Sequence, residues 1–184
     1  MQIDKQSGKL LDAEFIASPN YDERPDPDDI NLIVIHNISL PPGEFGGPWI
    51  CDLFTNRLDP EQHPFFREIH QMTVSSHVLI RRDGSVIQFV PFQKRAWHAG
   101  KSNYCGRERC NDFSIGIELE GSDDTPFEDQ QYQQLCLLIQ ALIGTYSGLN
   151  LERLTGHSDI APGRKTDPGP YFDWTRLRKL LKSG

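Results

Sequence analysis

The sequence predicts a single α/β domain with a mixed central β-sheet flanked by helices. Short apolar runs typical of strands occur within 32–35, 78–90 and 114–120, whereas 129–143 has helical periodicity. Strands and helices interleave along the chain, which favours an α/β fold. The length of 184 residues fits about one domain. We expect residues 1–30 to form an extended lead-in packed on the domain and residues 31–184 to form the domain itself.

The first strand is expected at Leu32–Ile35, where four consecutive apolar residues indicate a strand covered on both faces. This strand is expected to end at His36 and Asn37. The following segment, 39–48, is rich in proline and glycine and predicts a long loop, and long ordered loops are often functional. Because of its glycine and proline content, Gly43–Trp49 is the part of this loop that is the candidate for movement on substrate binding.

A hairpin and a two-faced strand follow. Residues 78–82 and 86–90 flank Asp83-Gly84, a pair typical of a tight primed turn. The strand expected at Ser114–Glu120 alternates apolar and polar residues. Its two faces carry different side chains: Ile115, Ile117 and Leu119 on one, and Gly116, Glu118 and Glu120 on the other.

One clear amphipathic helix is predicted over 129–143, after a capped entry at 125–128. A second, shorter helix is predicted from Asp173, as N-cap, to Leu181. Short helices are also expected at Trp49–Phe54 and Gln62–His70.

Composition argues against several classes of protein. The chain has 19 basic and 26 acidic residues and a net charge of -7, which opposes binding to nucleic acid. No segment approaches the ~20 apolar residues of a membrane span, and the N-terminus lacks a signal-peptide core. We therefore expect a cytoplasmic protein with no membrane partner. The four cysteines form no CxxC pair and are expected to be free thiols, although Cys105 and Cys110 could form a bridge on oxidation.

Three side chains on separate segments could bind a metal ion. His36 ends a buried strand, and strand ends in α/β sheets are common ligand sites. His157 and Asp167 lie in HSDIAPGRKTDPG, a segment too rich in proline and glycine to form a helix or strand. Two imidazoles and a carboxylate can hold zinc and leave one position for water. Spacing alone leaves open that His157 is a structural donor and Asp167 a turn residue before Pro168.

Other residues could act on a substrate. Glu118 could take a proton from a metal-bound water, or it could be a solvated carboxylate on an open sheet face. Lys165 could offset the negative charge of a tetrahedral intermediate, or it could simply be exposed. Trp97 could stack on a sugar or fill the core, and Arg109 could grip a carboxylate.

Over nearly its whole length the chain resembles the zinc N-acetylmuramoyl-L-alanine amidase family, which is related to T7 lysozyme and the peptidoglycan recognition proteins. The motifs that carry this resemblance are VIHNISLPPGEFGGPWI, SHVLIRRDG, RAWHAG, CNDFSIGIELEG and GHSDIAPGRKTDPG. It is most similar to the cytoplasmic members that act on 1,6-anhydro-N-acetylmuramyl peptides during peptidoglycan recycling.

The resemblance implies one Zn²⁺ per chain, held by His36, His157 and Asp167, and no organic cofactor. It implies that a zinc-activated water cuts the amide between the lactyl group and L-alanine. Glu118 is then the general base and acid, and Lys165 stabilises the oxyanion. The positions implied for the sugar and peptide subsites are Asn37, Trp97 and Arg109. We expect a monomer whose partner is the anhydro-muropeptide.

Three alternatives remain open on the sequence. A lytic amidase of the same fold would attack intact peptidoglycan. A peptidoglycan sensor would keep the groove but lose metal ligands, whereas this chain retains all three. A non-haem iron oxygenase also uses two histidines and a carboxylate, although Glu118 and Lys165 suit hydrolysis better.

Overall fold

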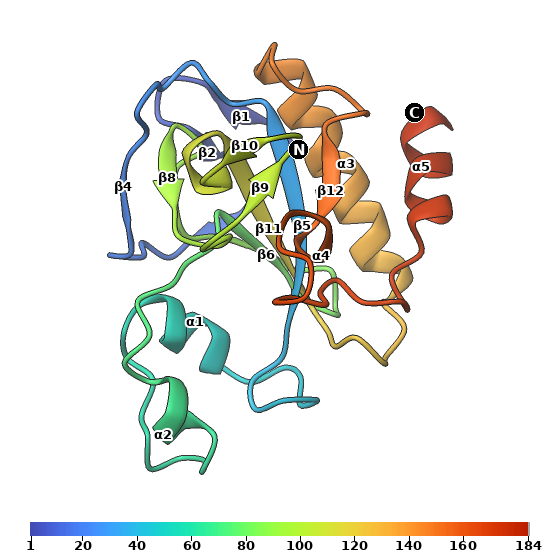
Figure 1. The fold of residues 1–184 in the computed structure, drawn as a ribbon. Coiled ribbons are helices and arrows are strands. Elements are labelled where there is room, and N and C mark those ends of the chain that lie inside the picture. The colour runs from blue at the N-terminus through green and yellow to red at the C-terminus, as the bar shows by residue number, and fades with distance from the viewer. Residues whose placement is uncertain (184) are drawn as a thin grey trace.

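Six strands form a mixed sheet in the order β12–β5–β11–β6–β7–β3 in the computed structural model (Figure 1), which describes residues 1–183. Gly184, the last residue of the predicted domain, lies outside the described residues. The strand bounds are Leu154–Gly156 (β12), Leu32–Ile38 (β5), Ser114–Glu120 (β11), Val78–Ile80 (β6), Val86–Gln88 (β7) and Glu14–Phe15 (β3). Strands β12, β5, β11 and β6 run parallel, and β7 runs antiparallel to β6. The predicted mixed α/β sheet is confirmed.

Helices and small strand pairs surround this sheet. The helices are α1 (Trp49–Phe54), α2 (Phe66–Ile69), α3 (Asp129–Thr145), α4 (His157–Ile160) and α5 (Trp174–Ser183), with one 3-10 turn at Cys110–Asp112. The small antiparallel pairs are β1 (Ile3–Asp4) with β2 (Lys9–Leu10), β4 (Tyr21–Glu23) with β8 (Lys94–Ala96), and β9 (Asn103–Tyr104) with β10 (Arg107–Glu108).

The two faces of the sheet have different covers. Figure 1 shows α3 and α5 together on one side of the sheet, with α1 and α2 extending away on the other. Ile115, Ile117 and Leu119 of β11 belong to the core cluster that includes α3 and α5. The opposite face of β5 packs against loop residues such as Ala99 and Phe113. All seven residues of β11 are buried, so Glu118 does not lie on an open, solvated sheet face.

Strand β5 is longer than its apolar run predicts. It continues through His36 and Asn37 to Ile38, because all seven of its residues pair in parallel register with β11. Backbone hydrogen bonds to β11 therefore carry the strand past the last of the four consecutive apolar residues, and His36 lies inside the sheet.

The predicted hairpin is confirmed, but its turn is of a different type. Within the described residues, Gly84 has a positive φ (+83°) and Asp83 does not. Gly84 N donates to Arg81 O at 2.9 Å and Arg81 N donates to Ser85 O at 2.9 Å, so five residues join β6 and β7. This pattern matches an ordinary turn followed by a left-handed glycine, in place of a two-residue primed turn.

The helices follow the predictions with two corrections. Glu128 and Gln131 form a capping box that starts α3, and Asp173 Oδ1 accepts from Arg176 N as the predicted cap of α5. Helix α2 is only four residues long, shorter than the predicted 62–70. The segment after β12, where no helix was predicted, starts with the single turn α4, because the Asp159 carboxylate accepts the N–H of Gly156.

The first 30 residues add strands that the sequence did not predict. Strand β3 pairs in parallel with β7 and completes one edge of the central sheet. Arg24, only 5% exposed, donates to the carbonyls of Phe92, Asn111, Asp112 and Ser114. A buried charge needs such partners, and this one joins the lead-in to the loops that precede β11.

The four cysteines are free thiols within the described part of the chain, as predicted. Among residues 1–183, no helix has both the length and the apolar character needed to cross a membrane.

His77 is a buried imidazole directly before β6, beside Gly116 of β11. Gly116 N donates to its Nδ1 at 3.0 Å, which leaves Nε2–H facing Lys94 O at 3.1 Å. Burial, together with the nearby Arg24 guanidinium, lowers the pKa of His77 from 6.5 to about 3. The folded protein therefore keeps this ring neutral at pH values where the unfolded chain binds a proton.

We expect His77 to make the protein less stable as pH falls below about 6.5, because only the unfolded chain takes up this proton. Between about pH 7 and about pH 5, wild type should lose about 2 kcal/mol more unfolding free energy than His77→Gln, which cannot titrate. Urea unfolding at both pH values measures this difference. Parallel losses in the two proteins would contradict it.

Candidate functional site

The register of three neighbouring strands places three site residues side by side, in one row across the sheet. In β5 and β11, His36 pairs with Glu118, and in β12 and β5, Gly156 pairs with Ile35. His157 directly follows Gly156, so it lies next to His36 on the far side from Glu118. Neighbouring parallel strands lie about 4.8 Å apart, which brings the three side chains within reach of one another.

Three possible metal-ligand atoms, from His36, His157 and Asp167, lie close together beside this row of residues. Nδ1 of His36 lies 3.0 Å from Nδ1 of His157, and each lies 3.0 Å from Oδ2 of Asp167. His36 is 1% exposed and His157 is 3% exposed. Of the described residues, these are the histidine, cysteine and acidic side chains whose ligand atoms converge closely enough to share an ion.

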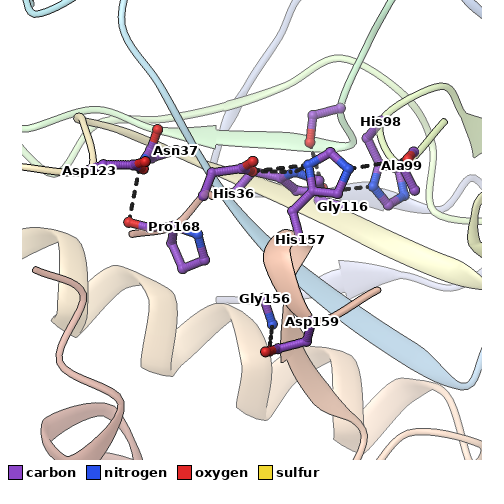
Figure 2. A network of polar contacts seen from close by, with 12 residues as sticks. His36, Asn37, His98, Ala99, Gly116, Asp123, Gly156, His157, Asp159 and Pro168 are labelled. Atoms are coloured by element: carbon purple, nitrogen blue, oxygen red, sulfur yellow. Dashed lines mark hydrogen bonds and ion pairs between the residues drawn. The ribbon is translucent and has the colours of Figure 1, made fainter. Parts of the chain in front are cut away.

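The orientation of His157 is fixed from its far side (Figure 2). Its Nε2 lies 3.1 Å from the carbonyl oxygen of Ala99, which can only accept, so Nε2 carries the proton. Nδ1 is then unprotonated and faces the Asp167 carboxylate. Two lone pairs this close repel each other, and a cation between them relieves the repulsion. The donor set therefore fits a divalent transition-metal ion.

Protonation states in the cluster also suit a metal ion. Burial lowers the pKa of His36 from 6.5 to about 4, so the ring is neutral near pH 7, as a ligand must be. Burial alone would raise the pKa of Asp167, but a proton on the neighbouring His157 or His36 ring would pair with the carboxylate, and this holds that pKa well below its ordinary range.

The loop that carries Asp167 is anchored by Asn37. The Asn37 amide donates to Asp123 Oδ1 at 2.7 Å and to Pro168 O at 3.0 Å, as Figure 2 shows. Ser158 N donates to the carbonyl of Asp167 at 2.9 Å. The backbone around Asp167 is thus held from strand β5 and from helix α4.

Glu118 is a buried carboxylate with an unused atom. It is 8% exposed, and its Oε2 has no hydrogen-bond partner among the described residues. Burial, and then the charge of Asp167, raises the pKa of Glu118 well above its ordinary value, while Lys165 opposes the shift. Such a carboxyl group holds a proton more readily than an exposed one and can therefore take up and return a proton in a reaction.

A cleft of about 350 Å³ opens over this row of residues. One wall is apolar and comes from α1, α2 and the chain near them. It is lined by Leu53, Phe54, Phe65, Ile69, Met72 and Val74. Trp97, Asn37 and Lys165 complete the lining near the three donor residues His36, His157 and Asp167. A ligand with both apolar and polar parts suits these walls.

The structure brings together all but one of the site residues expected from the sequence. His36, His157, Asp167, Glu118, Lys165, Asn37 and Trp97 line the same cleft. Arg109 lies outside it. Its side chain is 69% exposed, pairs with Asp112 at 3.2 Å and lines a neighbouring cavity of about 510 Å³ together with Arg164.

Three residues that contact the site had no assigned role on the sequence. Ala99 O orients His157, Asp123 orients Asn37, and the His98 ring contacts His36. One signal was present: Gly116 lies on the Glu118 face of its strand, and a glycine on a buried face leaves room for another group to pack closely. The sequence did not show which group that is.

Comparisons with known proteins agree on one family. The model of the N-acetylmuramoyl-L-alanine amidase family (Amidase_2) matches residues 26–170. A relative from Escherichia coli (strain K12), the 1,6-anhydro-N-acetylmuramyl-L-alanine amidase AmpD, is 61% identical over 176 residues, 96% of each chain.

Two solved structures are also similar. A crystal structure of a selenomethionine AmpD derivative matches with a TM-score of 0.94 and 58% identity, over 98% of this chain and 99% of that one. The E. coli amidase AmiD, in complex with the substrate anhydro-N-acetylmuramic acid-L-Ala-D-γ-Glu-L-Lys, matches with a TM-score of 0.60 and 31% identity. That match covers 94% of this chain and 60% of the AmiD chain.

We expect the chain to bind one divalent transition-metal ion, with Zn²⁺ or Co²⁺ as the probe. Asp167→Asn and His157→Ala should each weaken binding about 100-fold or more, since the first replaces a charged carboxylate by a neutral, weaker ligand and the second removes an imidazole. Competition with a chelator of known affinity measures this loss.

His70→Ala, which alters a histidine outside the cluster, is the control and should bind the ion like wild type. Unchanged affinity in the Asp167 and His157 variants would contradict this ligand set.

Proposed function

Since the chain belongs to the N-acetylmuramoyl-L-alanine amidase family and is itself such an amidase, we propose that it hydrolyses the lactyl–L-alanine amide of 1,6-anhydro-N-acetylmuramyl peptides. Relatives named for this activity match it over nearly their full lengths. The observation that carries the proposal is the convergence of His36, His157 and Asp167 beside Glu118 in one cleft.

Zinc is the ion that we propose for the three-donor site. Two imidazoles and a carboxylate are a common catalytic zinc set that leaves a coordination position open. Bound there, zinc would supply Lewis acidity, polarising a carbonyl group and making a water molecule acidic enough to ionise near neutral pH. The neutral state of His36 and the charged state of Asp167 both suit this ion.

Glu118 is the proposed general base and general acid. Its unpartnered Oε2 takes a proton from the attacking water and later returns it to the nitrogen of L-alanine, which must be protonated to leave. A buried carboxyl group suits both steps, because burial brings its pKa closer to the working pH.

Lys165 is the proposed partner of the oxyanion. It lines the same cleft as Glu118 and belongs to the loop that carries Asp167. Its positive charge offsets the negative charge that develops on the carbonyl oxygen as the amide is attacked.

We also propose roles for the expected substrate-binding residues. Trp97 lies in the cleft and offers a ring face to the sugar, and Asn37 lies between the cleft and the Asp167 loop. Arg109 lies at the neighbouring cavity, so it could reach only the distal part of the peptide.

The proposed setting is cytoplasmic peptidoglycan recycling by a monomer. Every residue of the proposed machinery comes from one chain, so a second copy is not needed to complete the site. The net charge of -7 opposes a nucleic-acid partner. The substrate proposed here is a small, released fragment of the cell wall.

Glu118→Gln should keep the metal ion but lower kcat about 1,000-fold, because the amide cannot accept the water proton. Activity on anhydro-muropeptide and metal content should be measured on the same sample. Normal turnover in this variant would remove Glu118 from its proposed role.

Substrate choice separates recycling from lysis of the wall. With soluble anhydro-muropeptide, mass spectrometry should detect free peptide beginning with L-alanine together with 1,6-anhydro-N-acetylmuramic acid, and a chelator should abolish both products. Intact sacculi should release far less peptide under the same conditions. Faster release from sacculi would favour the lytic amidase instead.

A further inference from the structure

The His98 imidazole lies directly against the proposed metal ligands. Its Nδ1 is 2.9 Å from Nε2 of His36, and the two rings meet edge to face. Nδ1 of His36, the other ring nitrogen, is the one that faces His157 and Asp167. His98 therefore contacts the side of His36 that is turned away from the other two donor atoms. Figure 2 shows the position of His98 in this network.

Gly116 makes room for this contact. A Cβ at position 116 would lie 2.4 Å from Cγ of the His98 ring and 2.6 Å from its Nδ1. Atoms cannot approach so closely, so a side chain at 116 would displace the ring from His36. The alternation of β11 places Gly116 on the same face as Glu118.

A chain of hydrogen bonds fixes the protons on both rings. The Ser114 hydroxyl lies 2.6 Å from Cys110 O, a carbonyl that can only accept, so Ser114 donates its one proton there. Ser114 Oγ must then accept from His98 Nε2, which is 3.1 Å away. His98 Nδ1 is consequently unprotonated, and it accepts the proton of His36 Nε2. This leaves Nδ1 of His36 with a free lone pair that faces Nδ1 of His157 and the Asp167 carboxylate.

The segment that carries His98 also orients His157, the second imidazole of the donor set. Asn111 Oδ1 accepts from the backbone N–H groups of His98 and Ala99, at 3.2 and 2.8 Å. The carbonyl of Ala99 in turn accepts from His157 Nε2. Two adjacent residues, held by one asparagine, thus orient both imidazoles of the cluster.

We propose that His98 is a positioning residue that holds His36 in the tautomer whose Nδ1 can bind a metal ion. This inference deepens the proposed function and rests on the three-donor site described above. Partners of this kind usually change metal affinity by about 10- to 100-fold.

The test compares three variants for Zn²⁺ affinity by chelator competition. His98→Leu removes the acceptor and should weaken binding about 10- to 100-fold. His98→Asn keeps an acceptor near the Nδ1 position and should recover most of that loss. Ser114→Ala removes the group that fixes the His98 proton, so it should weaken binding to an intermediate degree even if the leucine variant does not fold.

A second readout separates positioning from simple packing. In metal-free protein, ¹⁵N–¹H long-range correlation spectra report which nitrogen of His36 carries the proton. Wild type and His98→Asn should show one tautomer, protonated at Nε2, and His98→Leu and Ser114→Ala should show a mixture. Wild-type affinity together with an unchanged tautomer in Ser114→Ala or His98→Leu would overturn the proposal, as would an asparagine variant as weak as leucine.

Failure of the proposed function would look different. In that case wild type itself would bind no zinc, or Asp167→Asn would bind as tightly as wild type. If Asp167→Asn weakened Zn²⁺ binding while the His98 and Ser114 variants bound Zn²⁺ like wild type, only the role of His98 would be contradicted.

Discussion

The parallel pairing of β12, β5 and β11 is the constraint on which the site depends. Backbone hydrogen bonds fix the register, and that register sets His157, His36 and Glu118 in one row. A shift of one residue would turn each side chain to the opposite face of the sheet. The apolar residues that alternate with the site, such as Ile35 and Ile117, would then leave the core beneath α3. The same strand register is therefore required for the packing of the core and for the geometry of the site.

Burial gives these polar side chains their chemistry. Removed from water, His36 stays neutral and Glu118 holds its proton more tightly than an exposed carboxyl group does. Asp167 behaves in the opposite way: its pKa lies well below the ordinary range, because a proton on either neighbouring imidazole would pair with the carboxylate. One small region thus contains neutral, charged and proton-holding groups together. The cost of burying the two imidazoles is offset by contacts from behind: the carbonyl of Ala99 for His157 and the ring of His98 for His36.

Much of the fold could be predicted from local pattern, because the pattern and the structure obey the same periodicity. The alternation of 114–120 placed Glu118 on the correct face of its strand, and the capping residues marked the start of α3 and α5. Contacts between distant segments could not be predicted this way. The continuation of β5 to Ile38 depends on its partner strand, and His98 reaches His36 only because a loop crosses the sheet over Gly116. Resemblance to a family supplied the ligand set, which spacing alone had left open.

The lead-in has a consequence for how the chain behaves when shortened. Strand β3 occupies the open side of β7, and Ile16 and Ser18 extend the contact by donating to Gln88 O and Phe89 O. The family match begins only at residue 26, after this segment. A chain that began at residue 26 would leave β7 as a bare sheet edge, with unsatisfied backbone groups able to pair with another molecule. Self-association and poor yield would follow from such trimming, even though every residue that lines the cleft would still be present.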